Sequence, residues 1–357
     1  MNHRLLQQSI ANIRSHNHQL PSTDFTKPCQ IVEHFGMIQA QDFNSAKWAI
    51  GVRLSECTEE LINESYNKGE ILRTHVLRPT WHLITPENIR WMLELSAKRI
   101  IRSMKSRDSE LGLTDEIYAK CYRIIERALE KEDCITRDGL VNVLHNAGMK
   151  VNSSQLYHVV TGAEATGIIC SGVLCDNKYT YALLEKRVPA AKPLTKEESL
   201  AKLARIYFTG HGPATLQDFV WWSGLPVSEA RHGLEAVRSA FVSETVNEQE
   251  YWMPDIDFMP SVVSTLHLLP AFDEYIVGYK DRTAVITSEN HKKAISSNGV
   301  FRPVVVKNGR VIGLWKKTNS RKKAIAITSF EPVDPETQQQ IDRSAEKFLD
   351  LFMIYQK

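Results

Sequence analysis

The clearest pattern of helices and strands in the chain lies in residues 195–253, TKEESLAKLARIYFTGHGPATLQDFVWWSGLPVSEARHGLEAVRSAFVSETVNEQEYWM. Apolar residues recur at helical spacing in three segments, separated by a Gly-His-Gly-Pro breaker and a Ser-Gly-Leu-Pro turn. Two short runs of β-forming residues follow. The expected helices span 197–208, 215–222 and 227–239, and the expected strands span 242–246 and 251–253. Three helices and a hairpin in this order predict a winged helix-turn-helix.

The same order of elements is expected twice more upstream, as a repeat of pattern with little shared sequence. The second copy has helices over 115–130, 136–146 and 153–164 and strands over 168–170 and 179–182, with Asp176-Asn177 at the turn. The copy at the start has helices over 5–15, 28–35 and 45–54 and wing segments over 71–78 and 80–84. Residues 187–194, with two prolines and no periodicity, are expected to be a linker.

The last hundred residues change to β-rich patterning. Strands are expected over 262–269, 284–287, 304–307, 311–315 and 324–327, with Asn308-Gly309 as a hairpin turn and a closing helix over 335–355. This patterning indicates a small β-barrel or sheet. The predicted fold class is therefore α+β, with tandem winged helix-turn-helix modules followed by a small C-terminal β-barrel-like domain. The expected boundaries are 1–100, 101–190, 195–258 and 260–357.

Composition and charge exclude several classes of protein. The 357 residues are 43% hydrophobic and carry 44 basic and 42 acidic side chains, so a nucleic-acid surface must come from local clustering. No apolar run approaches the roughly 20 residues of a membrane helix, and no secretory signal is evident. The six cysteines lack Cys-x-x-Cys or zinc-finger spacing and indicate reduced thiols in the cytoplasm. Nucleotide-binding, dehydrogenase, hydrolase and zinc-protease motifs are absent, so neither cofactor nor metal is expected.

Basic residues gather in two places. The clusters are Lys98, Arg99, Arg102, Lys105 and Arg107, and then Lys316, Lys317, Arg321, Lys322 and Lys323. Taken alone, such runs are more often solvated surface than binding sites. Beside three winged-helix patterns, we interpret them as contacts to DNA phosphates.

The segment FGMIQAQDFN, residues 35–44, places Gln39 and Gln41 two positions apart. In an extended chain their side chains face the same way, and two amides together can hold a water molecule. An amide does not act as a strong base. Asp42 or Asn44 is a suitable N-cap for the next helix. From spacing alone, the alternative that both glutamines bond loop backbone is favoured.

Two further groups carry polar side chains. Arg78, Thr80 and His82 share one face if that segment is extended, so that His82 is either a proton shuttle or a satisfied histidine beneath the wing. Asp273 and Glu274 lie at a turn beside Tyr275 and suggest acid–base or metal chemistry. Without a matching third ligand, a role in tethering the loop is favoured for the two acids.

Four segments together resemble a known family. They are IQAQD (38–42), LRPTWHL (77–83), LPAFDEYIVGYKDR (269–282) and NGRVIGLW (308–315). In this order they resemble the bacterial winged-helix DNA glycosylases of the AlkZ and YcaQ type. The resemblance implies tandem winged helices, a C-terminal β-domain, a basic DNA channel and excision of alkylated purines, with unhooking of interstrand crosslinks by some members. That family has Gln-apolar-Gln and Gln-apolar-Asp signatures, and Gln39-Ala40-Gln41 matches the first.

The resemblance thus assigns the catalytic role to Gln39 and Gln41, with Asp42, Arg78, Thr80 and His82 as candidate supporting residues. The expected protein is a monomeric, cytoplasmic DNA N-glycosylase that acts on double-stranded DNA with alkylated purines. Two alternatives stay open on the helix pattern alone. One is a non-catalytic tandem winged-helix regulator that binds DNA, and the other is a protein-interaction scaffold.

Overall fold

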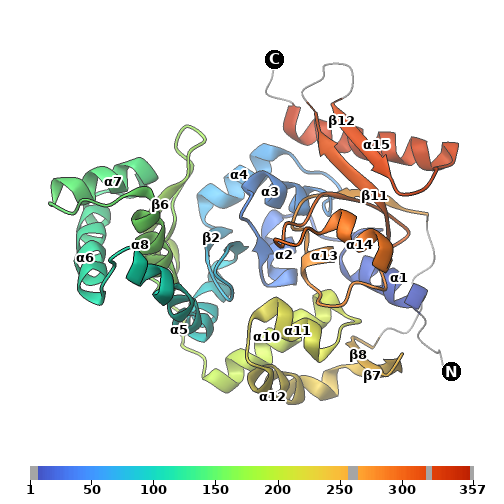
Figure 1. Cartoon of the computed structure of the whole chain (residues 1–357), viewed down its shortest axis with the longest axis horizontal. Helices are drawn as coiled ribbons and strands as arrows, with labels where there is room; N and C mark the ends of the chain where they lie inside the picture. Colours follow the sequence, from blue (N-terminus) through green and yellow to red (C-terminus); the bar gives the residue numbers. More distant parts are fainter. Residues whose placement is uncertain (1–6, 256–263, 319–323, 354–357) are drawn as a thin grey trace. The chain divides into compact units, whose positions relative to one another are not determined.

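The computed structural model describes residues 7–255, 264–318 and 324–353, which form a mixed α+β fold (Figure 1). The chain divides into two compact units. Unit 1 combines residues 1–62 with 200–357, and unit 2 comprises residues 63–199. Unit 1 is therefore built from both ends of the sequence. In the described ranges, no helix has the length and apolar composition needed to cross a bilayer.

Unit 1 contains helices from three parts of the chain and a C-terminal sheet. Its helices are α1 (Gln7–Asn17), α2 (Pro28–Phe35), α3 (Phe43–Gly51), α10 (Lys196–His211), α11 (Leu216–Ser223), α12 (Val227–Val237), the 3-10 turn Arg238–Ala240, α13 (Glu274–Val277), α14 (Ser288–Ala294) and α15 (Pro335–Met353). Its strands are β1 (Ile38–Gln39), β7 (Val242–Val246), β8 (Gln249–Met253), β9 (Leu266–Leu269), β10 (Val304–Lys307), β11 (Arg310–Lys317) and β12 (Ile325–Ser329). Helix α4 (Glu59–Lys68) spans the division between the units, and the first residues of α10, up to Ser199, also belong to unit 2.

The core of unit 1 joins the N-terminal helices to the C-terminal sheet. Ile10 of α1 and Trp48 of α3 belong to one buried cluster with Val305 of β10 and Trp315 of β11. The indole N–H of Trp48 donates to the carbonyl of Leu268, 2.5 Å away. Burial of this shared apolar surface provides the main force that holds the sequence-distant segments together.

Of the two forms expected for the C-terminal region, a small barrel or a sheet, the described residues form an open sheet and no closed barrel. Strands β12, β11, β10 and β9 pair antiparallel in that order, which leaves β12 and β9 at opposite edges. A barrel requires its first and last strands to pair, and four short strands do not close around a packed interior. Helix α15 lies against this sheet (Figure 1). The rings of Phe348 on α15 and Trp315 on β11 are in contact, with 4.9 Å between their centroids.

The other expectations for this region have mixed outcomes. The hairpin turn at Asn308-Gly309 is confirmed, since both residues have the positive φ angles of a two-residue hairpin loop. The strand expected over 284–287 is wrong, because these residues form a turn that leads into α14. Part of the strand expected over 262–269 lies outside the described residues, while β9 occupies its end.

Unit 2 contains a helical group with a small sheet, and two further antiparallel strands that contact this sheet. Its elements are β2 (Leu72–His75), β3 (Trp81–Ile84), α5 (Pro86–Glu110), α6 (Asp115–Lys131), β4 (Ile135–Thr136), α7 (Arg137–Asn146), α8 (Ser153–Ala165), β5 (Ile169–Ser171), β6 (Thr180–Leu183) and α9 (Leu184–Arg187). Helices α6, α7 and α8 share one buried cluster with β5 and β6, and β4, β6 and β5 pair in that order.

Local sequence signals explain why most of these helices begin where they do. The N-cap residues of α6, α7, α8 and α11 each accept a hydrogen bond from a backbone N–H of the first turn; they are Thr114, Thr136, Asn152 and Thr215. Helix α11 also ends at Gly224 in the left-handed conformation. The helices and strands expected over 115–182 and 197–253 are therefore confirmed to within a few residues.

Candidate active site

The Gln-Ala-Gln segment lies in unit 1 between two helices. Helix α2 ends at Phe35, Gly36 reverses the chain with a φ of 76°, and β1 then carries the chain to Gln39. Asp42 begins α3 as its N-cap. The extended presentation expected for Gln39 is therefore confirmed, and Gln41 occupies the short link between β1 and the cap.

The two glutamines differ in exposure. Gln39 is 8% exposed and Ala40 is 0% exposed, whereas Gln41 lies at the surface. Apolar neighbours on both sides, among them Ile38 and Phe43, are buried and hold the segment against the core. Solvent and any large substrate therefore reach Gln41 more readily than Gln39.

Of the two N-cap candidates, Asp42 and Asn44, the structure has Asp42 as the cap of α3. One carboxylate oxygen accepts from the backbone N–H groups of Asn44 and Ser45 at 3.0 and 3.3 Å, and the other accepts from the Ser45 hydroxyl at 3.0 Å. These bonds fix the start of α3 and thereby the end of the Gln-Ala-Gln segment.

The other end of the segment is fixed by Glu274, which is 1% exposed. The backbone N–H of Gln39 donates to its Oε1 at 3.2 Å. The Trp222 indole N–H donates to Oε2 at 3.0 Å, and His211 Nε2 lies 3.4 Å from the same oxygen. The buried carboxylate thus joins β1, α10 and α11.

Its neighbour Asp273 is a second buried anchor. Its two oxygens accept from Arg53 Nη1 and Nη2 at 2.8 and 2.7 Å, and Arg53 Nε donates to the His18 carbonyl. Asp273 also caps α13 by accepting from the Tyr275 N–H. The tethering role favoured for Asp273 and Glu274 is therefore confirmed. No group of three or more His, Cys, Asp and Glu side chains in the described ranges is arranged to hold a metal ion.

Three histidines near this network are kept neutral by burial. Desolvation holds the pKa of His18 well below its usual value and lowers that of His211, although Glu274 raises the latter in part. Burial lowers the pKa of His34 to about 4. At neutral pH these rings therefore act as uncharged packing and hydrogen-bonding groups.

Arg78, Thr80 and His82 come together in unit 2, in and beside the loop between β2 and β3. Arg78 Nη2 lies 3.1 Å from His82 Nε2, and Thr80 Oγ1 lies 3.5 Å from the same nitrogen. His82 is 0% exposed, and burial, reinforced by the charge of Arg78, holds its pKa well below its usual value. Burial and the low pKa oppose a proton shuttle. The alternative of a satisfied histidine is met only in part, because Nε2 has two polar neighbours while the buried Nδ1 has no hydrogen-bond partner among the described residues.

The basic residues fall in two units. Lys98 and Arg102 are exposed on α5 of unit 2, and Arg99 is half-buried. Acids from outside the run pair with two other members: Asp115 bonds Lys105 at 2.7 Å, and Glu110 bonds Arg107. Lys316 and Lys317 are exposed at the end of β11 in unit 1. Arg321, Lys322 and Lys323 lie outside the described residues.

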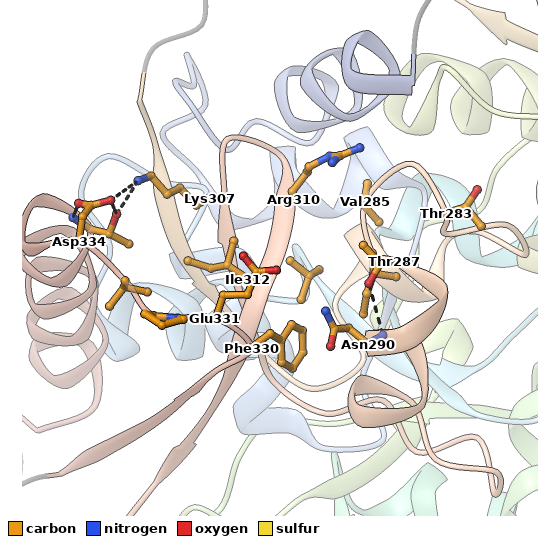
Figure 2. A pocket seen from close by; sticks show the side chains of 15 residues that line it. Thr283, Val285, Thr287, Asn290, Lys307, Arg310, Ile312, Phe330, Glu331 and Asp334 are labelled. Atoms are coloured by element: carbon orange, nitrogen blue, oxygen red, sulfur yellow. Dashed lines mark hydrogen bonds and ion pairs between the residues drawn. The ribbon is translucent and has the colours of Figure 1, made fainter.

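A separate cavity of about 280 Å³ in unit 1 is not lined by the glutamine segment. Figure 2 shows its lining from β10, β11 and the start of α15, with Lys307 directed toward Asp334 at 3.6 Å. The cavity wall carries both acids and bases, including Arg310 and Glu331. Its charges do not define one kind of ligand.

Sequence reasoning did not identify Arg53, His211 or Trp222 as parts of the site. Glu274 and Gln39 are 235 positions apart, and no local spacing connects them. One signal was available: two acids within the apolar run LLPAFDEYIV predict buried carboxylates, which require hydrogen-bond partners.

Comparison with known proteins agrees with this architecture. The model of the family described as DNA glycosylase AlkZ-like matches residues 32–351. A relative from Streptomyces sahachiroi, named interstrand DNA cross-link repair glycosylase, is 24% identical over 337 residues, which cover 87% of this chain and 85% of the relative. The solved structure of the DNA glycosylase AlkZ from the same organism matches with a TM-score of 0.81 and 20% identity, covering 98% of this chain and 97% of that one.

The family match spans most of the chain, and the structural match shows that the fold is shared over nearly its whole length. Members of this family are hydrolases that cleave N-glycosyl bonds in DNA. On this evidence, the chain belongs to the AlkZ-like DNA glycosylase family.

Proposed function

We propose that this protein hydrolyses the N-glycosidic bond of purines alkylated at N7 or N3 in duplex DNA, with Gln39 and Gln41 as its catalytic residues. One observation carries the assignment to these residues. The Gln-Ala-Gln segment is held at one end by Glu274 and at the other by the Asp42 cap, with Gln41 exposed between them.

The chemistry of the lesion suits two uncharged side chains. Alkylation at N7 places positive charge on the base, and the electron pair of the breaking C1′–N9 bond neutralises it. The base then leaves as a neutral molecule without a strong acid. Water forms the new C1′–O bond and releases its surplus proton to solvent. Since the sugar is oxocarbenium-like at the transition state, the site needs an aligned water and favourable dipoles more than a strong base.

A carboxamide meets this demand because its oxygen accepts from a water and its nitrogen donates. The exposed Gln41 is assigned to contact the attacking water. The nearly buried Gln39 is assigned to complete the water's hydrogen bonds from the strand side. The neutral state of His18, His34 and His211 supports a mechanism without a charged imidazole in this network.

Basic residues of each unit are proposed to bind DNA. Helices α6–α8 with β5 and β6, and α10–α12 with β7 and β8, have the element order of winged helices, which we propose as their arrangement. Lys98 and Arg102, and Lys316 and Lys317, are proposed to contact DNA phosphates. Arg78 is proposed to support DNA binding through its charge. We also propose that the protein works as a monomer in the cytoplasm.

The name of the Streptomyces sahachiroi relative adds a second class of substrate. An interstrand crosslink formed through N7 of two purines carries the same charged leaving group on each strand. We propose that this protein releases one such purine and thereby unhooks the two strands. A base that is attached to both strands cannot easily be flipped into a buried pocket. Gln41 lies at the surface and could therefore reach such a base without flipping.

The test measures release of 7-methylguanine from a defined duplex in a single turnover, with enzyme in excess. Gln41→Ala should slow release by about 10²–10³-fold, the usual effect of removing one positioned dipole. Affinity for the duplex should stay nearly unchanged. Gln339→Ala, an exposed glutamine on α15, is the matched control and should behave as wild type.

Equal release by wild type and Gln41→Ala would overturn the residue assignment. Binding without release from any alkylated duplex would overturn the activity and favour a DNA-binding regulator. A crosslinked duplex run in parallel on a denaturing gel separates monoadduct excision from unhooking.

A further inference from the structure

We infer that Glu274 is the positioning residue of the catalytic glutamines: its buried carboxylate fixes the backbone of Gln39 and so sets where Gln41 meets the substrate. The inference rests on the proposed function. It concerns a residue that does not touch the reacting atoms but controls the segment that does.

The backbone donor of Gln39 requires an acceptor. Its N–H is buried with the end of β1, and a buried backbone donor without an acceptor destabilises the fold. The acceptor here is a side-chain carboxylate from a distant segment, Oε1 of Glu274 at 3.2 Å. Movement of β1 relative to α13 therefore breaks a hydrogen bond to a charged group, which is stronger than a neutral one.

The carboxylate of Glu274 cannot rotate freely. While Oε1 accepts from Gln39, Oε2 is held by the Trp222 indole at 3.0 Å and faces His211 at 3.4 Å. The His211 ring is in turn stacked on Tyr207, with 4.7 Å between centroids. Gly278 leaves room for this ring, because a Cβ there would lie 2.7 Å from it.

The backbone that carries Glu274 is held on both flanks. On one side Asp273 is locked to Arg53 by two hydrogen bonds. On the other side the Tyr275 hydroxyl donates to the carbonyl of Gly309 at 2.6 Å. Glu274 thus projects from a rigid turn, and it transmits that rigidity to β1.

The consequence is a four-residue catalytic segment fixed at both ends. Glu274 holds the Gln39 end and the α3 cap holds the Asp42 end, so Gln41 has little freedom to shift. Displacing a positioned group by about 1 Å costs on the order of 10²-fold in rate. Loss of the Glu274 anchor should therefore reduce the rate of the chemical step and leave DNA affinity intact.

The experiment compares three variants: one changes Glu274 directly, and the other two change the neighbouring tryptophans Trp221 and Trp222 on α11. Glu274→Gln keeps the size of the side chain but replaces one acceptor oxygen by an N–H₂ group, so Gln39 or Trp222 loses its acceptor. Trp222→Phe removes the indole donor to Oε2 together with part of a fully buried ring. Trp221→Phe is the matched control, since that indole donates to the Val277 carbonyl instead.

Three quantities are measured on each variant: the single-turnover rate of 7-methylguanine release, the Kd for the same duplex, and the backbone amide signal of Gln39 with ¹⁵N-glutamine labelling. Absence of that signal in Gln39→Ala assigns it. Glu274→Gln should slow release by about tenfold to a hundredfold with Kd within about twofold of wild type. Its Gln39 amide signal should shift upfield, because the charged acceptor is gone. Trp222→Phe should show smaller changes of the same sign, and Trp221→Phe none.

A folded Glu274→Gln that releases base at the wild-type rate overturns the inference and leaves the proposed function standing. If Glu274→Gln does not fold, equal rates for Trp222→Phe and Trp221→Phe overturn it. If wild type releases no base from any duplex, the proposed function fails and the positioning role fails with it. A merely structural role would lower the unfolding midpoint without separating the rate from Kd.

Discussion

Arg53 and Asp273 form a two-pronged ion pair that is closed to solvent, with exposed fractions of 1% for both residues and N–O distances of 2.8 and 2.7 Å. The pair joins the turn that follows α3 to the start of α13, where Glu274 lies. It connects residues 220 positions apart and helps to unite the two sequence halves of unit 1.

Asp273→Asn should destabilise unit 1 strongly. The substitution leaves the Arg53 guanidinium buried without a counter-charge, and breaking a buried pair in this way costs about 3–5 kcal/mol. The amide still caps α13, so the decrease in stability reports the ion pair. Urea unfolding followed by circular dichroism measures it. Glu235→Gln, which breaks the exposed pair with Arg238, should leave the midpoint nearly unchanged. Equal midpoints for the two variants would contradict this account.

Mild acid should destabilise the fold through its buried histidines. Burial lowers the pKa values of His34 and His267 to about 4, below the ordinary value of 6.5 that applies in the unfolded chain. Between pH 4 and pH 6.5 the two histidines bind protons in the unfolded chain but not in the folded protein. Their contribution to the free energy of unfolding is therefore fully present above pH 6.5 and is lost as the pH falls toward 4.

Urea unfolding at pH 7.5 and pH 5.5 measures this dependence before most carboxylates titrate. In the wild type, His34 Nε2 lies 2.7 Å from the Asn17 carbonyl oxygen. The variant His34→Gln keeps a hydrogen-bond donor at this position but has no titratable group. Its unfolding free energy should change less between the two pH values than that of wild type. An identical pH dependence would show that His34 does not contribute.

Local signals in the sequence predicted the elements around the site well. Three kinds of feature depend only on residues a few positions apart, and the sequence therefore predicts them: the Asp42 cap, the Asn308-Gly309 turn and the helical spacing of apolar residues. The spacing of Gln39 and Gln41 was equally visible, but by itself it favoured two glutamines that bond loop backbone. Their catalytic role rests on the resemblance to the family signature and stays a prediction.

Features that depend on distant pairing could not be predicted in this way. A barrel would form if β9 and β12 paired with each other, and an open sheet forms because they remain at opposite edges. Local β-patterning does not record which strands pair, so it could not distinguish the two. The Glu274–Gln39 bond likewise depends on the packing of both chain ends into unit 1. The unequal burial of Gln39 and Gln41 also follows from this packing, and their spacing of two did not reveal it.

Gly309→Ala should destabilise the C-terminal sheet for two separable reasons. A side chain at its φ of 76° costs roughly 1–2 kcal/mol. A Cβ there would also lie 2.7 Å from the Ala11 carbonyl oxygen, so α1 must move. Gly299 has a similar φ of 73° with open space around a Cβ, which makes Gly299→Ala the control for the backbone cost alone. We expect Gly309→Ala to unfold at a clearly lower urea concentration than Gly299→Ala. Equal unfolding midpoints for the two variants would exclude the steric contribution.

Neutralising the exposed basic residues should weaken DNA binding without changing which duplex is preferred. Lys98→Ala, Arg102→Ala and Lys316→Ala each remove one proposed phosphate contact, so the slope of log Kd against log salt should decrease by about one in each variant. Fluorescence anisotropy over a range of salt concentrations measures this slope. Lys292→Ala carries the same charge change at an exposed position outside both clusters and is the control. If it lowers the slope equally, only net charge matters and the clusters are ordinary solvated surface. A decrease confined to the cluster variants identifies the two clusters as the phosphate-binding surface. Because phosphate contacts carry no information about the base, methylated and unmethylated duplexes should lose affinity in the same proportion.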